Sequence, residues 1–429
     1  MPSAAPESQV LKPGARKVLF GGFLGSLAAV GLTVYLFGVF QDALVSAFAT
    51  DVATLSWAPA IFTAASGLLS PLVGRALATP TRPGLSIRSV MFVGVFAIGL
   101  GLGLVSRSTA LWSAAAAFAF LVAPGAILLG PLLGQAMVTN WFEASRGWAL
   151  GIVSAGTTVG GVLVPPLAAI LIEAFGWRTA LATLGGMEVL LMAPAVAWLV
   201  RDRPSEERGD AATDPVALRR EEAAAGVPAE GETQTSAELL RDPRLWLIGV
   251  TFGLLFSAGM ISTVFTVPYA SELSVPLVSG ALIASLRAGS AAAGKIVLGT
   301  ASDRYGVVTV LFVVIVTEVV LTGLLVGTRS PLGFAVLGVA IGFVGGSPLP
   351  LKAALVGRTF GAANFPAAMG LLQSIAMPFQ LLMVPLAGLV YQAVGTYAAV
   401  FGLTIPCFAL AGVSLSLLAR RDRSASPSS

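Results

Sequence analysis

Residues 18–44 read VLFGGFLGSLAAVGLTVYLFGVFQDAL and follow the basic residues Lys12, Arg16 and Lys17. Asp42 is the one charged residue in this stretch, which is long enough to cross the roughly 30 Å hydrocarbon core of a bilayer as a helix. It is too long for the apolar region of a cleaved signal peptide, which spans about 7–15 residues. The stretch therefore predicts a membrane-spanning helix preceded by a short polar tail.

The whole chain has the composition of a protein that faces lipid. Of its 429 residues, 56% are hydrophobic and 11% are charged, and the mean hydropathy is +0.89. A soluble domain carries about 25% charged residues, so most of this surface cannot face water. Similar apolar stretches recur at 53–77, 87–106, 111–139, 147–172, 177–200, 244–271, 278–302, 308–328, 332–357, 365–391 and 397–419. With the first stretch they predict an all-α membrane protein of twelve spanning helices.

The twelve spans fall into two groups of six. The predicted parts are an N-terminal tail (1–17), a first bundle (18–200), a polar linker (201–243), a second bundle (244–420) and a C-terminal tail (421–429). The linker has too few large apolar residues to fold alone, so we interpret it as a tether, with a regulatory or partner-binding role as the alternative. An offset of 218 to 219 residues relates the segment from Pro131 to Phe142 to the segment from Pro350 to Phe360, which indicates an internal repeat.

The distribution of basic residues predicts the orientation. If the N-terminus is cytoplasmic, 19 Lys and Arg residues fall in cytoplasmic loops and tails and 3 in outer loops, the asymmetry expected from the positive-inside rule. Both termini and the linker are then cytoplasmic. The Ala- and Gly-rich composition is typical of a GC-rich bacterium, so we expect a multi-pass protein of the bacterial inner membrane.

The sequence lacks the residues that several classes of function require. The chain has no histidine, which excludes His-based metal sites and His proton relays, and its single cysteine, Cys407, cannot form a disulfide within the chain. It contains neither a phosphate-binding P-loop motif nor the G-x-S-x-G elbow of hydrolases. The basic residues are scattered rather than gathered into a patch. We therefore expect no enzyme activity, no cofactor, no metal and no nucleic-acid partner.

A loop after the eighth span carries the most specific motif, GKIVLGTASDRYG at residues 294–306. It is similar to the G-x-L-x-D-R-x-G loop of the major facilitator superfamily, which the chain resembles over essentially all twelve spans. The matching loop of the first half keeps Pro71, Gly74 and Arg75, but Ala78 stands where the family has an acidic residue. The resemblance implies two pseudo-symmetric six-helix bundles that rock around a substrate held between them.

Within the superfamily the chain most resembles the bacterial monocarboxylate and oxalate/formate carriers. The similar segments are YLFGVF at 35–40, LSW at 55–57, RGWALGI at 146–152, PP at 165–166 and FGWR at 175–178. The G-P-x-x-G-G run of drug/proton antiporters is missing from the fifth span. In the carboxylate carriers a cation stands four residues before a glycine of the eighth span, which corresponds to Lys295 here, although those carriers usually have arginine.

Charges inside the spans predict the substrate site, because each costs about 2.5–3.5 kcal/mol at mid-helix and normally faces a cavity or a partner. Arg287 lies roughly 24 Å from Asp303 along its helix, and its planar fork suits a carboxylate. Its alternatives are outward snorkelling or an ion pair with Glu272. Lys295 and Lys352 are the other cationic candidates, each with snorkelling to the headgroups as its alternative. Tyr35 and Gln41 of the first span complete the predicted substrate-binding set.

Other polar residues have candidate roles. Asp42 is the candidate for proton coupling, with a solvated residue at the outer mouth as the alternative. Asp303, Arg304, Arg75 and Arg146 are predicted to form the gating contacts at the inner side. Glu188 and Glu318 fall within peripheral spans, where either a structural or a functional role is possible. The glycine clusters at 156–160 and 342–346 are expected to let the two halves approach closely and slide, or to serve ordinary tight packing, and the two roles do not conflict.

These features lead to one main hypothesis. The chain is expected to be a monomeric secondary active transporter that moves a small organic anion, a mono- or dicarboxylate, by alternating access in the lipid bilayer. Coupling is to protons or to exchange of a second anion. The alternatives are an efflux carrier for hydrophobic compounds and, from another class, a non-transporting membrane receptor or assembly protein.

Overall fold

The computed structural model describes residues 14–78, 86–139, 141–142, 146–201 and 234–425. Within these ranges the chain is almost entirely helical and contains no strand, which confirms the predicted all-α class. Eleven stretches are long and apolar enough to cross a membrane. The longest, Trp148–Leu199, contains 52 residues and breaks at Gly176, where φ is 78°, so it supplies two spans and the described residues contain the twelve expected ones.

The first half of the chain forms six spans with several internal breaks. Its first span is a single helical stretch, Ala15–Phe48, in which five residues form a π-helical turn, η1. A second π-helical turn, η2, and a break at Gly130 divide the fourth span. The elements are α1 (Ala15–Val30), η1 (Gly31–Tyr35), α2 (Leu36–Phe48), α3 (Val52–Leu55), α4 (Trp57–Ala78), α5 (Ile87–Arg107), α6 (Leu111–Ala117), η2 (Phe118–Val122), α7 (Ala123–Leu129), α8 (Pro131–Thr139) and α9 (Arg146–Leu199).

The second half begins earlier than expected, with a short helix inside the segment interpreted as a tether. This helix, α11, starts with a capping box in which Thr235 and Glu238 satisfy each other's backbone amides, and Leu239 anchors it in the core. Residues 202–233 of the linker lie outside the described residues. The elements are α11 (Ser236–Arg241), α12 (Pro243–Glu272), α13 (Leu277–Tyr305), α14 (Val307–Gly327), α15 (Pro331–Gly345), α16 (Pro348–Val394), α17 (Tyr397–Gly402) and α18 (Thr404–Ala425).

Breaks at equivalent positions relate the two halves. Gly176 separates the fifth and sixth spans and Gly395 separates the eleventh and twelfth; both have a φ of 78°, a conformation that favours glycine, and they lie 219 positions apart. The fourth span breaks at Gly130, and the tenth span breaks at Gly346 and Ser347 between α15 and α16. These paired breaks support the internal repeat that the sequence offset indicates.

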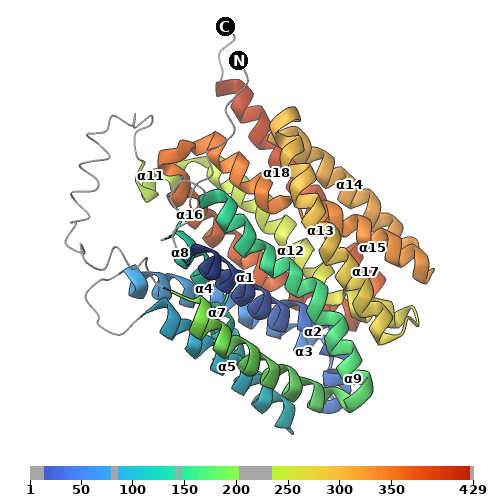
Figure 1. Cartoon of the computed structure of the whole chain (residues 1–429). Coiled ribbons are helices and arrows are strands. Elements are labelled where there is room, and N and C mark those ends of the chain that lie inside the picture. The colour runs from blue at the N-terminus through green and yellow to red at the C-terminus, as the bar shows by residue number, and fades with distance from the viewer. Residues whose placement is uncertain (1–13, 79–85, 140, 143–145, 202–233, 426–429) are drawn as a thin grey trace, which may run out of the picture.

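The spans run side by side between two ends (Figure 1). We call the end at Ala15, Leu199 and Pro243 the linker end, and the end at Phe48 and Glu272 the far end. In Figure 1 the linker end lies toward the upper left and the far end toward the lower right. The first-half helices α1, α4 and α5 occupy the lower side of this view, and α13, α14 and α18 of the second half occupy the upper side.

The glycine clusters highlighted in the sequence pack within each half. A Cβ atom on Gly156 would lie 2.2 Å from the carbonyl oxygen of Phe23 in α1, and one on Gly342 would lie 2.3 Å from that of Arg287 in α13. The interpretation that these clusters bring the two halves together is therefore wrong. A close approach between the halves occurs instead at Gly38, where a Cβ atom would lie 2.4 Å from the carbonyl oxygen of Val264.

Candidate functional site

A cavity of about 430 Å³ lies between the two halves. Its polar and charged lining consists of Tyr35, Thr63, Thr263, Arg287, Lys295, Lys352, Gln373 and Gln380, from α12, α13 and α16 of the second half and from η1 and α4 of the first. Its volume lies in the range of small-molecule sites. Three cations therefore share one cavity, and its described lining includes no carboxylate.

Arg287 lines this cavity from α13. Its Nη1 atom donates a hydrogen bond of 3.2 Å to the Thr263 hydroxyl of α12. Pairing with Glu272, one of its alternatives, is not observed, because that carboxylate lies at the far end, where it accepts hydrogen bonds of 2.6 Å from Thr396 Oγ1 and the Tyr397 amide. The other guanidinium donors are not bonded to any described carboxylate and can meet a bound anion.

Lys295 and Lys352 also point into the cavity rather than to a membrane surface. The Lys295 ammonium donates a hydrogen bond of 3.0 Å to Thr158 of α9, in the other half. The Lys352 ammonium lies 5.0 Å from the centre of the Phe256 ring, within cation–π range, and the residue is 7% exposed. Both ammonium groups are thus held next to the cavity by neutral partners, which leaves their charges uncompensated there.

The cavity is also lined by neutral polar residues that the sequence did not predict as substrate-binding residues. Gln373 and Gln380 lie seven positions apart on α16 and so share one face of the helix, and Thr263 supports Arg287. Two glutamines with heptad spacing in an apolar span are a signal that could have identified this face. Tyr35 does line the cavity, at the end of the π-helical turn η1, and π-helical turns occur often at functional sites.

Gln41 and Asp42 lie outside this cavity, nearer the far end. The Gln41 carboxamide is fully buried and donates a hydrogen bond of 2.7 Å to the Tyr397 hydroxyl in the other half. Asp42 lines a second pocket, of about 470 Å³, together with the carboxylates of Asp51 and Glu272. Of the two first-span residues predicted to bind substrate, Tyr35 lines the cationic cavity, whereas Gln41 lines neither that cavity nor the acidic pocket, and the proton-coupling candidate Asp42 lies in the acidic pocket.

The far end holds the two halves together. Besides the bond between Gln41 and Tyr397, the backbones meet at Gly38, and a Cβ atom on Gly388 of α16 would lie 2.8 Å from the Cα atom of Ala53 in α3. The amide of Val278 donates a hydrogen bond of 3.4 Å to the Glu173 carboxylate across the same seam. The seam is thus closed on the far side of the cavity.

Of the four predicted gating residues, the structure describes the side chains of Asp303 and Arg304. Asp303 and Arg304 end α13 with exposed side chains, and neither forms an ion pair or a hydrogen bond within the described part of the chain. The backbones of Arg75 and Arg146 are helical, but their side chains lie outside what the structure describes.

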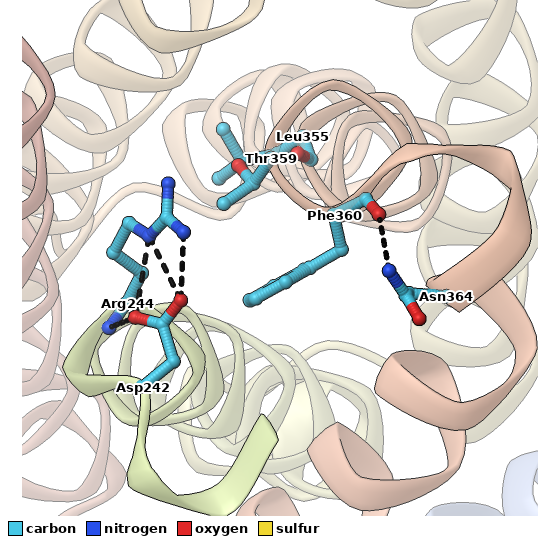
Figure 2. A network of polar contacts seen from close by, with 6 residues as sticks. All are labelled: Asp242, Arg244, Leu355, Thr359, Phe360 and Asn364. Atoms are coloured by element: carbon cyan, nitrogen blue, oxygen red, sulfur yellow. Dashed lines mark hydrogen bonds and ion pairs between the residues drawn. The ribbon is translucent and has the colours of Figure 1, made fainter. Parts of the chain in front are cut away.

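At the linker end, α12 and α16 of the second half carry a polar network (Figure 2). Asp242 caps α12 and pairs with Arg244 at 2.8 Å, and the Arg244 guanidinium lies 5.8 Å from the centre of the Phe360 ring. Asn364 donates to the Phe360 carbonyl at 3.2 Å and accepts from the Gln234 amide at 2.8 Å. Burial alone would raise the pKa of Asp242, but the hydrogen bonds from Arg244 outweigh it and hold that pKa below its usual value.

Comparisons with known proteins agree with this architecture. The family model of the Major Facilitator Superfamily matches residues 18–286 and 247–429. Monocarboxylate transporter 13 of Bos taurus is 27% identical over 401 residues, which cover 92% of this chain and 87% of that protein. An agnestins efflux protein of Paecilomyces divaricatus is also 27% identical, over 395 residues that cover 89% of this chain and 82% of that protein. The solved structure of a nucleoside transporter, NupG, has a TM-score of 0.73 at 13% identity and covers 94% of this chain and 99% of NupG, a likeness of fold alone.

Proposed function

Because the chain belongs to the Major Facilitator Superfamily of membrane transporters, we propose that the solute it carries is a small organic anion, a mono- or dicarboxylate. One observation carries this proposal: Arg287, Lys295 and Lys352 line the same cavity between the halves, and its described lining has no carboxylate to neutralise them. Buried cations are costly, and an anionic ligand offsets that cost. The monocarboxylate transporters among the relatives point to the same class of solute.

The cavity's cations and its amide and phenol groups have different parts in this proposal. The planar guanidinium of Arg287 donates two parallel hydrogen bonds to a carboxylate group of the solute. The ammonium groups of Lys295 and Lys352 attract the same carboxylate as point charges. Gln373, Gln380 and Tyr35 supply hydrogen bonds to the rest of the solute. Alternating access then exchanges the closure at the far end for a closure at the linker end, where Asp303, Arg304, Arg75 and Arg146 remain the candidate gating residues.

The proposal includes an orientation. The excess of basic residues at the linker end supports an orientation in which that end and both termini lie in the cytoplasm of a bacterial cell. The closed far end then faces outward, and the conformation is the inward-facing one. Reporter fusions after Arg201 and after Arg329 test this topology; activity of a cytoplasmic reporter at Arg329 rather than at Arg201 would reverse it.

Uptake into proteoliposomes tests the substrate class. Labelled L-lactate, pyruvate and oxalate are offered to vesicles that contain the wild type, Arg287→Ala or, as a matched control, Arg329→Ala, which removes an exposed arginine outside the cavity. Charge-assisted hydrogen bonds contribute about 1.5–3 kcal/mol, so Arg287→Ala should raise the apparent KM by about 10- to 150-fold. Equal uptake by the wild type and Arg287→Ala would overturn this assignment of the site.

Efflux of hydrophobic compounds is the second candidate function. The agnestins efflux protein is as similar to this chain as the bovine monocarboxylate transporter, and the cavity is also lined by Leu255, Phe256, Met260 and Leu349. Drug sensitivity of a deletion strain that is rescued equally by the wild type and by Arg287→Ala would favour efflux, because an uncharged solute does not need the guanidinium.

A further inference from the structure

Glu318 lies in the middle of α14 with almost no contact with solvent. It is 3% exposed, and its Oε2 atom is buried without a hydrogen-bond partner among the described residues. On the neighbouring helix α15, a Cβ atom on Gly345 would lie 3.1 Å from its Oε1 atom, so the carboxyl group rests against bare backbone. A carboxylate in such surroundings is expensive unless it is protonated or faces a positive charge.

The positive charge next to Glu318 is Arg287 of the substrate cavity. Both residues line a narrow pocket with a volume of about 10 Å³, and they interact electrostatically without forming a direct ion pair. Arg287 also lines the large cavity, which Glu318 does not. The guanidinium thus stands between the anion-accepting cavity on one side and the carboxyl group of Glu318 on the other.

No other charged group lines the narrow pocket within the described part of the chain. The helices that pack against α14 carry further titratable or charged residues, but none of them lines the narrow pocket. On α13, Lys295 lines the large cavity, and Asp303, Arg304 and Tyr305 lie exposed at the linker end. The others are Lys352 and Arg358 of α16, Tyr391 near its far end, Tyr397 of α17, bonded to Gln41, and Cys407, Arg420 and Arg421 of α18, of which Cys407 is bonded to the Leu403 carbonyl. Arg287 is therefore the charge to which Glu318 responds.

An anion that enters the cavity competes with Glu318 for Arg287. While the cavity is empty, the guanidinium charge partly stabilises an ionised Glu318. Once a bound carboxylate neutralises that charge, an ionised Glu318 is left as an uncompensated buried anion, which costs several kcal/mol. Proton uptake removes this cost, so anion binding and protonation favour each other, and by linkage protonation of Glu318 tightens anion binding.

We propose that Glu318 carries the proton that couples transport to the proton gradient. One proton crosses with each anion, because Arg287 links protonation of Glu318 to anion binding. This inference rests on the proposed function and specifies its coupling. The carboxylate takes the proton from a hydronium ion that reaches it past Arg287: one O–H bond of the hydronium breaks, the carboxyl O–H bond forms, and a water molecule is left. It returns the proton on the other side of the membrane when the anion leaves and the guanidinium charge is free again. A monovalent anion and its proton then cross with no net charge.

The experiment uses full-length protein in proteoliposomes with labelled L-lactate as the probe. Two modes are measured: exchange between lactate on both sides at equal pH, and net accumulation driven by a vesicle interior that is more alkaline than the medium. The variant is Glu318→Gln, a neutral mimic of the protonated acid. The matched control is Glu188→Gln, because Glu188 of α9 is 4% exposed and also has an unpartnered carboxyl oxygen, yet lines neither the cavity nor the narrow pocket.

We expect the wild type and Glu188→Gln to accumulate lactate about tenfold for a gradient of about one pH unit, the ratio for one proton per anion. Glu318→Gln should keep exchange, which requires no net proton movement, but should lose accumulation, and its apparent affinity should no longer depend on pH. Accumulation by Glu318→Gln at the wild-type level would overturn the coupling role. So would loss of exchange in a variant that keeps the wild-type melting temperature. Absence of exchange by the wild type for every carboxylate tested would instead overturn the proposed function.

Discussion

Lys295 of α13 donates its hydrogen bond to Thr158 of α9 and so ties a cationic group of the cavity to the opposite half of the molecule. The bond holds the ammonium at the seam, where a solute bound between the halves must meet it. Thr158→Val keeps the lysine but releases it, and a hydrogen bond to a charged group contributes about 1.5–3 kcal/mol. We expect the apparent KM for labelled lactate to rise about tenfold with little change in the maximal rate.

A double-mutant cycle distinguishes this positioning role from a general packing effect. Because Thr158 acts through Lys295, Thr158→Val should have no further effect once Lys295→Ala is present. Additive losses in the double variant would show that the threonine acts independently of the lysine.

Closure of the far end depends on a backbone contact between Gly38 and Val264. Gly38→Ala places a methyl group where the Val264 carbonyl oxygen lies, and overpacking of this kind costs about 1–3 kcal/mol. We expect the equilibrium to shift about tenfold toward the state that is open at the far end. A cysteine introduced at Ala53, which is 5% exposed and meets Gly388 of the other half at the same end, should then react faster with a membrane-impermeant maleimide. Gly186→Ala is the control, because nothing lies within 4 Å of its added Cβ atom; unchanged labelling in Gly38→Ala would contradict the prediction.

Hydropathy and charge predicted the architecture because the bilayer limits what a span can be. A charge within a span needs a cavity or a partner, and this is why Arg287, Lys295 and Lys352 could be selected before the structure showed that they share one cavity. The same reasoning did not find Thr158 or Thr263, since a neutral hydroxyl in a span satisfies its own helix backbone as readily as it faces a neighbour.

Which helices touch could not be read from the sequence. The spacing of Gly156 and Gly160 permits close packing, but it does not specify the partner, and the partner is α1 of the same half rather than the other half. The separation of Gln41 from the cavity also has a geometric cause. It lies six residues, about 9 Å, beyond Tyr35 along its helix, where the two halves have already closed.

Gly361 supplies the break between the tenth and eleventh spans, with a φ of 72° and a ψ of 172°. This conformation is essentially restricted to glycine and costs other residues about 1–3 kcal/mol. Gly361→Ala should therefore lower the melting temperature of the detergent-solubilised protein. Gly370→Ala is the matched control in the same helix, because its Cβ atom meets nothing within 4 Å and alanine is the better helix former by about 1 kcal/mol. The prediction is that the two substitutions shift the melting temperature in opposite directions, and a common direction would contradict it.

Asp242 links the stability of the linker end to pH. Its pKa is held below its usual value of about 3.9 by Arg244, so its charge stabilises the folded protein above that pH, and this contribution is lost as the pH falls through the folded-state pKa. Asp242→Asn keeps a residue that caps α12 but removes the charge, whereas Asp242→Ala also removes the cap, at a cost of about 1 kcal/mol. We expect the melting temperature to fall in the order wild type, Asp242→Asn, Asp242→Ala at pH 7. The gap between the wild type and Asp242→Asn should narrow below about pH 4 and close once the pH lies below the folded-state pKa, where the folded and the unfolded chain both hold the proton. A gap that persists in acid would show that the carboxylate acts through its shape and hydrogen bonds rather than through its charge.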